Sequence, residues 1–251
     1  MSAVAWPLPA VLAHRCGGAL APENTLAGLS VAAALGCRGV EFDVMLSADG
    51  VPVVIHDETV DRTTDGRGCV SALSLAELRR LDAGAWRGPA FAGERLPTLV
   101  ETLERCASLG LAVNLEIKPA TGHDVDTGRV VVETLLQGFA DALTGLVLSS
   151  FSESSLAAAR AVCPDFQYGL LFGELPEDWG TRAGALQVDA IHADTRYLSA
   201  ATVAQLRDAG YRVAAYTEND PVLATRLRRW GVDSVITDRP DVVLDSVIMT
   251  A

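Results

Sequence analysis

Short apolar runs along the chain alternate with longer segments in which apolar residues recur every three or four positions. The runs predict strands, and they lie at 10–14, 39–44, 111–117, 144–151, 166–172, 188–193, 211–217 and 232–237. Near-continuous apolar strands that alternate with helices favour a parallel sheet covered by helices. Eight such strands in 251 residues fit a (β/α)8 TIM barrel better than a doubly wound sheet. No G-x-G-x-x-G fingerprint follows the first strand, which also disfavours a dinucleotide-binding sheet.

Residues with known terminal preferences mark where several helices begin and end. Asn24 or Thr25 can cap the helix that follows the first strand, and Gly36 can end it. Ser199 is in the same capping position before a later helix. The apolar spacing over 127–143 predicts a further helix. Each of these signals agrees with a regular succession of strand and helix.

One connection is much longer than the others. It runs over residues 45–97, from the end of the second strand to the helix that starts near Pro97. It contains a hairpin signal, SADG before VPVVIHD, a short helical stretch, SLAELRRL, and the aromatic residues Trp86 and Phe91. Long connections inside compact domains tend to be functional lids or small subdomains. We therefore predict one barrel domain over 1–251 with an inserted subdomain at 45–97, on the side of the barrel where such enzymes build their sites.

Composition and charge narrow the choice of partners. The formal net charge is −12, so a nucleic acid or an anionic membrane surface would find no basic stripe to pair with. The N-terminus shows neither a signal peptide nor an apolar span, and no C-x-x-C pair occurs among the five cysteines. We expect a cytoplasmic protein, a monomer or homodimer, that acts on a small molecule, with no nucleic-acid partner and no membrane insertion.

Charged residues collect at the carboxyl ends of the first three predicted strands, the ends at which barrel enzymes place their catalytic groups. They are His14, Arg15, Glu41, Asp43, Glu116 and Lys118. Strand side chains alternate between two faces, so Glu41 and Asp43 share one face, and the Glu116–Lys118 pair does the same. Converging carboxylates repel one another, and a hard divalent cation, Mg²⁺ or Ca²⁺, would relieve that repulsion. Ordinary strand-end salt bridges are the structural alternative.

The four histidines and Cys16 differ in how well they fit a catalytic role. His14 is favoured because it ends a strand beside an arginine, and His56 is next because the insertion can fold back over the barrel mouth. We expect structural roles for His123 and His192, although His192 ends a strand and could line the site. Cys16 follows its neighbouring arginine, whereas a cysteine phosphatase needs an arginine several residues after the cysteine. We therefore expect Cys16 to be structural.

A set of motifs along nearly the whole chain resembles the bacterial glycerophosphodiester phosphodiesterases, most closely the cytoplasmic type. They are HR-x-G-G-x-x-APENT, EFD, S-x-DG, HD, RTT-x-G-x-G, DAG-x-W, EIKP, YT-x-N-D and GVD-x-x-ITDRPD. The resemblance implies a TIM barrel with a small inserted subdomain. It also implies metal-dependent hydrolysis of glycerophosphodiesters, such as glycerophosphocholine and glycerophosphoethanolamine, to sn-glycerol 3-phosphate and an alcohol.

The resemblance also implies roles for the charged residues, position by position. Glu41, Asp43 and Glu116 match the metal ligands of the family, and His14 and His56 match its acid/base pair. Arg15 matches the phosphate-binding arginine, and Lys118 matches the lysine beside the third metal ligand. We expect Lys118 to bind the substrate phosphate as well.

Two residues depart from the pattern of the family. Cys16 stands where many members have glycine, so a positive φ is not expected there. Tyr216 stands where many relatives have tryptophan, which could alter the leaving-group pocket.

The sequence leaves several points of chemistry open. Which histidine is the acid is one, and the nucleophile is another, since it could be a water or the 2-hydroxyl of the substrate. A lysine-dependent aldolase with a Schiff base on Lys118 is a different enzyme class, disfavoured because the acidic neighbours would keep that lysine protonated. A ligand-binding pseudoenzyme is the non-enzymatic alternative, and none of the expected ligands or histidines is missing here. Lysophospholipid or glycerophosphoinositol headgroups also remain open.

Overall fold

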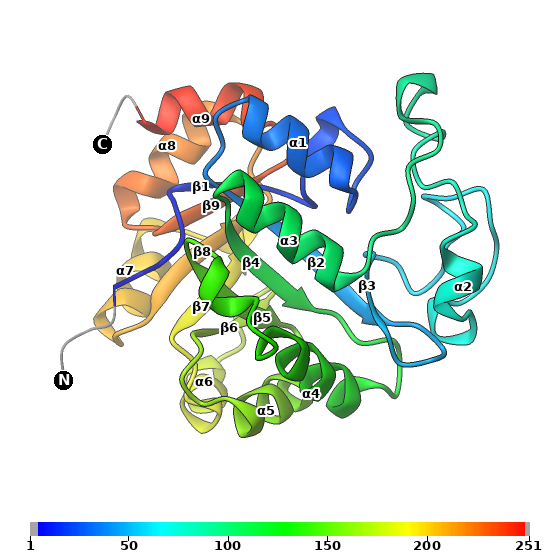
Figure 1. Cartoon of the computed structure of the whole chain (residues 1–251). Helices are drawn as coiled ribbons and strands as arrows, with labels where there is room; N and C mark the ends of the chain where they lie inside the picture. The colour runs from blue at the N-terminus through cyan, green and yellow to red at the C-terminus, as the bar shows by residue number, and fades with distance from the viewer. Residues whose placement is uncertain (1–4, 249–251) are drawn as a thin grey trace.

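Eight parallel strands close into a barrel in the computed structural model, which describes residues 5–248 (Figure 1). Neighbouring strands pair in sequence order around the barrel, and β1 pairs with both β2 and β9, which closes it. The strands are β1 (Val11–Ala13), β2 (Gly39–Leu46), β4 (Ala112–Ile117), β5 (Leu146–Ser150), β6 (Tyr168–Phe172), β7 (Ala190–Asp194), β8 (Arg212–Tyr216) and β9 (Ser234–Thr237). The predicted TIM barrel is confirmed.

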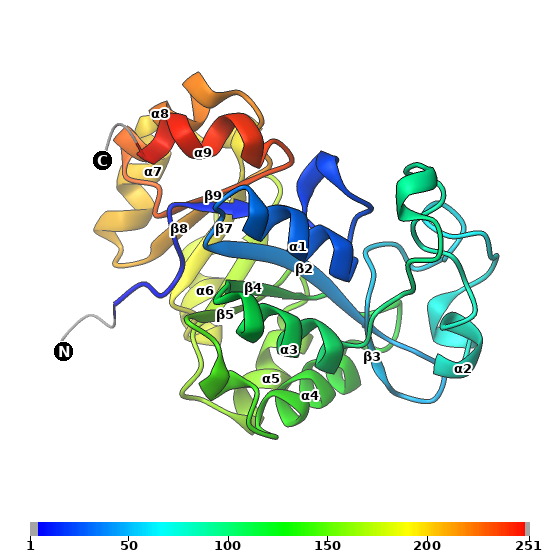
Figure 2. The same ribbon diagram turned by 45° about the horizontal axis from the view of Figure 1, so that its top comes forward.

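The helices lie around the outside of the barrel (Figure 2). They are α1 (Leu26–Ala34), α3 (Leu99–Leu109), α4 (Asp124–Leu135), α5 (Glu153–Val162), α6 (Trp179–Leu186), α7 (Ala200–Asp208), α8 (Pro221–Trp230) and α9 (Pro240–Ile248). Single 3-10 turns are η1 (Gly18–Leu20), η2 (Val70–Ala72), η3 (Pro89–Phe91), η4 (Ala140–Ala142) and η5 (Thr195–Tyr197). Within residues 5–248, no helix combines the length and the apolar character that a membrane crossing requires.

The helix termini follow the predicted signals with one exception. The Thr25 side chain accepts a hydrogen bond from the backbone of Gly28, and the Ser199 side chain does the same for Thr202. The helix predicted over 127–143 is α4, which begins three residues earlier and ends at Leu135. Gly138 lies beyond that end with a φ of 106°, a left-handed conformation that interrupts helical geometry.

Strand alternation separates the apolar core from the polar interior of the barrel mouth. On β2, Val40, Phe42 and Val44 belong to the main apolar cluster that packs with the helices, whereas Glu41 and Asp43 alternate with them. A smaller cluster of Leu8, Leu12, Ala112, Val147 and Ile236 is separate from that main core. The alternation therefore sends the two carboxylates of β2 to the opposite face from its core residues.

Residues 45–97 form an extension at the carboxyl ends of β2 and β4, seen at the right of Figure 1. It begins with the predicted hairpin, because β3 (Pro52–Val54) pairs antiparallel with the end of β2. The short helix α2 (Leu75–Leu78) follows. An apolar cluster of its own combines Met45, Val53, Ile55, Val60, Val70, Leu78, Ala83 and Leu96 with Ala120. The extension therefore has a small hydrophobic core beside the barrel mouth.

Candidate active site

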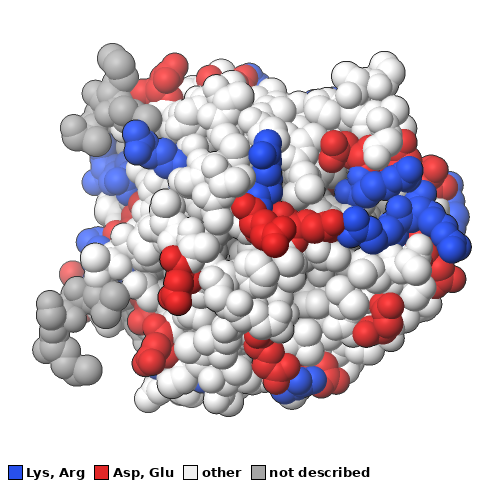
Figure 3. All heavy atoms as spheres, viewed as in Figure 1, with Lys and Arg blue, Asp and Glu red and all other residues white. Residues whose placement is uncertain are grey.

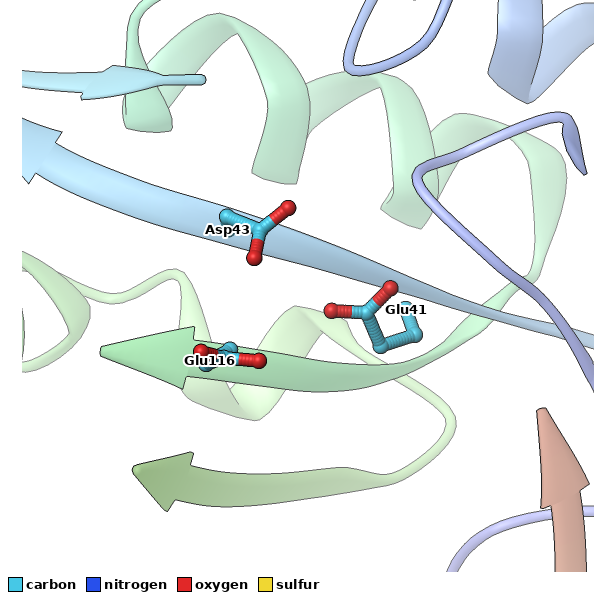
Figure 4. A group of neighbouring side chains, drawn as sticks. All are labelled: Glu41, Asp43 and Glu116. Atoms are coloured by element: carbon cyan, nitrogen blue, oxygen red, sulfur yellow. The ribbon is translucent and has the colours of Figure 1, made fainter. Parts of the chain in front are cut away.

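Three buried carboxylates meet inside the barrel mouth: Glu41 and Asp43 from β2, and Glu116 from β4 (Figure 4). Strand register places Asp43 directly beside Glu116, and each of the three offers an oxygen within 4.8 Å of the others. Burial, with the nearby charge of Asp43, raises the pKa of Glu41 to about 7 and that of Glu116 to about 8. An all-oxygen, acidic and desolvated donor set of this kind fits a hard divalent cation such as Mg²⁺ or Ca²⁺.

Lys118 lies beside this group, at the end of the same strand as Glu116. Its Nζ is 3.3 Å from Asp43 Oδ1 and 3.6 Å from Glu116 Oε1. Burial would raise the pKa of Asp43, but the charges of Lys118, His56 and Arg15 together lower it. Asn24 also donates a hydrogen bond of 2.9 Å to Asp43 Oδ2. Asp43 is therefore the carboxylate of the three that its neighbours hold in the ionised form.

His14 follows β1 and turns toward the carboxylates. Its Nδ1 lies 2.6 Å from Asp238 Oδ1, and its Nε2 lies 3.8 Å from Glu41 Oε2. Asp238 is itself fixed by Asn219, whose Nδ2 donates to Oδ2 over 3.1 Å and whose Oδ1 accepts from the Asp238 backbone over 2.7 Å. Burial alone would lower the pKa of His14, but the hydrogen bond to Asp238 and the charge of Glu41 raise it.

Arg15 bonds to the site through both its backbone and its side chain. The backbone N–H donates to Glu41 Oε2 over 3.0 Å, and Nη1 donates to Glu23 Oε1 over 2.9 Å. Its Nε is buried and lies 4.0 Å from Asp43 Oδ2, and it has no hydrogen-bond partner within residues 5–248. A buried donor without an acceptor is costly, so this position suits an anionic ligand.

The expectation for the backbone at Cys16 was wrong, because its φ is 75°. Hydrogen bonds on both sides hold the turn in this conformation, which non-glycine residues rarely adopt. The N–H of Cys16 donates to the Glu41 carbonyl over 2.8 Å, and the N–H of Gly18 donates to the His14 carbonyl over 2.7 Å. Burial raises the pKa of the Cys16 thiol well above its usual value, which agrees with a structural role.

His56 reaches the mouth from the inserted segment, shortly after β3. Its Nδ1 lies 2.6 Å from Asp57 Oδ1. Burial lowers the pKa of His56; the charge of Asp43 opposes this, and the charges of Lys118 and Arg15 add to it. The two histidines thus share one feature, a carboxylate on Nδ1, although they come from different parts of the chain.

A cavity of about 390 Å³ joins these groups. Six of the seven predicted site residues line it: His14, Arg15, Asp43, His56, Glu116 and Lys118. The seventh, Glu41, is buried next to His14 and Asp43. Tyr216 also lines the cavity, where its ring meets Phe151 edge to face at 6.0 Å and its hydroxyl donates to the Phe172 carbonyl. Asp194, Thr195, Arg196 and Thr217 complete the wall.

The two remaining histidines lie apart from this group. His192 is fully buried in β7, and burial lowers its pKa to about 3. His123 is exposed and precedes α4. Neither of them is among the residues that line the cavity.

Sequence reasoning from single residues missed the partners of the two catalytic candidates. They are Asp238 beside His14, Asp57 beside His56, and the pair Glu23 and Arg62 that link Asp57 to Arg15. All four lie within motifs of the resemblance, namely ITDRPD, HD, PENT and RTT. The motifs were the available signal, but only the structure shows what these four residues contact.

Comparisons with known proteins agree with a phosphodiester hydrolase built on a TIM barrel. The Glycerophosphoryl diester phosphodiesterase family matches residues 14–242. A glycerophosphodiester phosphodiesterase of Caldanaerobacter subterraneus subsp. tengcongensis is 36% identical over 242 residues, covering 94% of this chain and 97% of the relative. The chain belongs to this family and is a phosphoric diester hydrolase.

Solved structures give the same result. A phosphodiesterase of Oleispira antarctica, in complex with the product sn-glycerol-3-phosphate, superposes with a TM-score of 0.91 at 40% identity, covering 96% of this chain and 97% of the other. A glycerophosphodiester phosphodiesterase of Agrobacterium tumefaciens superposes with a TM-score of 0.77 at 28% identity, covering 95% and 100%. The similarity therefore includes the whole barrel.

Proposed function

We propose that the protein hydrolyses glycerophosphodiesters, such as glycerophosphocholine and glycerophosphoethanolamine, to sn-glycerol 3-phosphate and an alcohol. One observation carries the proposal: two histidines and two cationic side chains line one cavity beside a group of three buried carboxylates. The product complex of the Oleispira antarctica relative supports the glycerol 3-phosphate half of the substrate.

The phosphate would lie against Arg15 and Lys118. The unpartnered Nε of Arg15 offers a hydrogen bond to a phosphate oxygen, and Lys118 adds a second positive charge on the same cavity wall. Glu41, Asp43 and Glu116 would hold Mg²⁺ or Ca²⁺, which when bound supplies positive charge that stabilises the phosphate oxygens in the transition state.

His14 and His56 would move the protons. Each binds a carboxylate through Nδ1, which leaves Nε2 free to face the reacting atoms. One ring would deprotonate the nucleophile and the other would protonate the leaving alkoxide, a contribution of about 10²- to 10⁴-fold in rate. The nucleophile is a water or the 2-hydroxyl of the substrate. Hydrolysis in ¹⁸O-labelled water, with trapping of any cyclic phosphate, separates these two routes.

We extend the proposal to the organisation of the protein. Residues 45–97 act as an inserted subdomain of a single-domain protein over 1–251, and their role is to supply His56 to the barrel mouth. Their apolar cluster and the β2–β3 hairpin support this role. A cytoplasmic location, as a monomer or homodimer, completes the proposal.

The direct test is the release of glycerol 3-phosphate from a panel of glycerophosphodiesters with different headgroups. The assay compares wild type, His14→Ala and Glu41→Ala, each with and without a chelator. We expect release by wild type only, abolished by the chelator and restored by Mg²⁺ or Ca²⁺. Full activity in chelator, or in either variant, would contradict the mechanism.

A further inference from the structure

We propose that Arg62 is a positioning residue for this reaction: it bridges Asp57 and Glu23, and so fixes His56 and leaves the charge of Arg15 available to the phosphate. The inference deepens the proposed function and rests on the roles of His56 and Arg15 given there. Arg62 itself lines no part of the cavity in which those two residues meet.

The first half of the bridge holds His56. Arg62 grips the Asp57 carboxylate with two hydrogen bonds, from Nε to Oδ2 over 2.6 Å and from Nη2 to Oδ1 over 3.0 Å. The same Oδ1 lies 2.6 Å from His56 Nδ1. A carboxylate gripped at both oxygens cannot rotate freely, so the imidazole it holds keeps one orientation.

The second half of the bridge reaches the barrel. Arg62 Nη1 donates to Glu23 Oε2 over 2.7 Å, and Nη2 donates to Oε1 over 2.8 Å. Glu23 precedes α1 in the loop that also carries Arg15, whereas Arg62 belongs to the inserted segment. One guanidinium therefore ties the segment that supplies His56 to the loop that supplies Arg15.

Charge balance around Glu23 explains why this link concerns the phosphate. Arg15 Nη1 shares Glu23 Oε1 with Arg62, so two guanidinium groups compete for one carboxylate. While Arg62 neutralises Glu23, the Arg15 charge is left for another anion. Without Arg62, Glu23 would pair with Arg15 alone and would compete with the substrate phosphate for it.

The bridge differs from the other basic side chains of the inserted segment, which gather with acidic ones at the right of Figure 3. Arg67 pairs with Asp61 at 3.4 Å, but its side chain is 81% exposed, against 45% for Arg62. Arg79 pairs with Glu101, at the start of α3, rather than with a residue near the site. Arg67 is therefore a matched control, an arginine on the same segment that contacts neither histidine nor Arg15.

The kinetic experiment compares Arg62→Gln with Arg67→Gln, using glycerophosphocholine and saturating Mg²⁺. We expect Arg62→Gln to lower kcat by about 10- to 100-fold, because His56 is no longer held, and to raise KM severalfold. Arg67→Gln should retain both constants. The double variant Glu23→Gln/Arg62→Gln removes the competing carboxylate, so its KM should return toward wild type while its kcat stays low.

A spectroscopic experiment tests the same inference without turnover. In wild type, the ¹⁵N shifts of the neutral His56 ring should report one tautomer, with the proton on Nδ1 facing Asp57. Arg62→Gln should give a mixture of tautomers, while Arg67→Gln should match wild type. Thermal unfolding of each variant verifies that the fold is intact.

The outcomes separate this inference from the proposed function. An unchanged His56 tautomer in Arg62→Gln overturns the positioning role, whether or not activity falls. A KM that stays raised in the double variant overturns the charge competition at Glu23. If wild type releases no glycerol 3-phosphate from glycerophosphodiesters, the proposed function fails, and the tautomer of Arg62→Gln still decides the positioning role.

Discussion

The site has two halves, one on the barrel strands and one on the inserted segment. Each half holds a histidine through a carboxylate on Nδ1, but different contacts fix that carboxylate. His14 leaves a barrel strand, and its partner Asp238 directly follows another, β9. Asn219 fixes Asp238 through neutral amide groups. His56 comes from the inserted segment, and its partner Asp57 is fixed by a guanidinium. Strand register places the first histidine, whereas ion pairs between distant segments place the second.

This difference has energetic consequences. Strand pairing in the barrel is supported by a large apolar core, so His14 has a rigid base. The ion pairs of Arg62 are partly exposed, and pairs of that kind contribute about 0 to 1 kcal/mol to stability. Loss of one such pair should therefore leave the fold intact while the geometry of His56 changes. The insertion is the half in which position and stability can be separated by mutation.

Removal of either ring should have the largest effect and should show that both halves matter to the chemistry. We expect His14→Ala and His56→Ala each to lower kcat by about 10²- to 10⁴-fold, because each removes a proton-transfer group. Steady-state release of glycerol 3-phosphate measures this, and circular dichroism checks the fold. A variant with wild-type kcat would remove that histidine from the mechanism.

Removal of the carboxylate behind each ring should have a smaller effect. We expect Asp238→Asn and Asp57→Asn to lower kcat by about 10- to 100-fold, because the ring remains but loses its charged partner on Nδ1. Stability should fall more in Asp238→Asn, since Asp238 joins two strand ends, whereas Asp57 contacts His56 and Arg62 within the inserted segment. Equal kcat in wild type and Asp238→Asn would show that the barrel alone orients His14.

The carboxylates between the two histidines should make the metal-free protein sensitive to pH. Their pKa values, about 7 for Glu41 and about 8 for Glu116, lie above the usual 4.5. The folded protein then binds more protons than the unfolded chain. The contribution of these two groups to stability is therefore fully present below about pH 4.5 and is lost as the pH rises toward about 8. Asp43, whose pKa is lowered, has the opposite effect: its contribution to stability is lost only as the pH falls through that lowered pKa.

Differential scanning calorimetry in chelator should therefore show Tm falling between about pH 5 and about pH 8. Glu116→Gln should weaken this trend, because it removes one of the two raised groups. Mg²⁺ or Ca²⁺ should also weaken it, since a bound cation favours the ionised carboxylates. A Tm that rises over this interval in chelator would contradict the assignment of buried, protonated carboxylates.

The barrel half was readable from the sequence because its pattern is local. In GVEFDV the apolar residues alternate with Glu41 and Asp43, and in LAVNLEI the same alternation presents Glu116. Eight repeats of strand and helix then bring these positions to one mouth. The end of α4 was misjudged because apolar spacing continues past Gly138, whose left-handed backbone the spacing does not reveal.

The insertion half was not readable in the same way. His56 became a catalytic candidate because it lies on a segment that can fold back over the barrel mouth. Its role in an acid/base pair was implied by the resemblance to the family. Glu23 lies 39 residues from Arg62, and in the barrel half too the partner Asp238 lies 224 residues from His14. No periodicity connects such pairs, because tertiary folding alone sets their distance. Their motifs could be recognised, but the contacts that give those motifs a physical purpose could not.

The smallest effect is expected at Cys16, within the barrel half. Its φ of 75° costs a non-glycine residue about 1 to 3 kcal/mol, and glycine would remove that strain. Against this gain, Cys16→Gly removes the packing of a fully buried thiol and adds conformational freedom to the unfolded chain. The stabilising and the destabilising effects should therefore nearly cancel. We expect Cys16→Gly to keep kcat within about twofold and the free energy of unfolding within about 1 kcal/mol. Urea unfolding and the release assay measure both. A loss of activity as large as that of His14→Ala would make the thiol a reacting group, against its raised pKa and its complete burial.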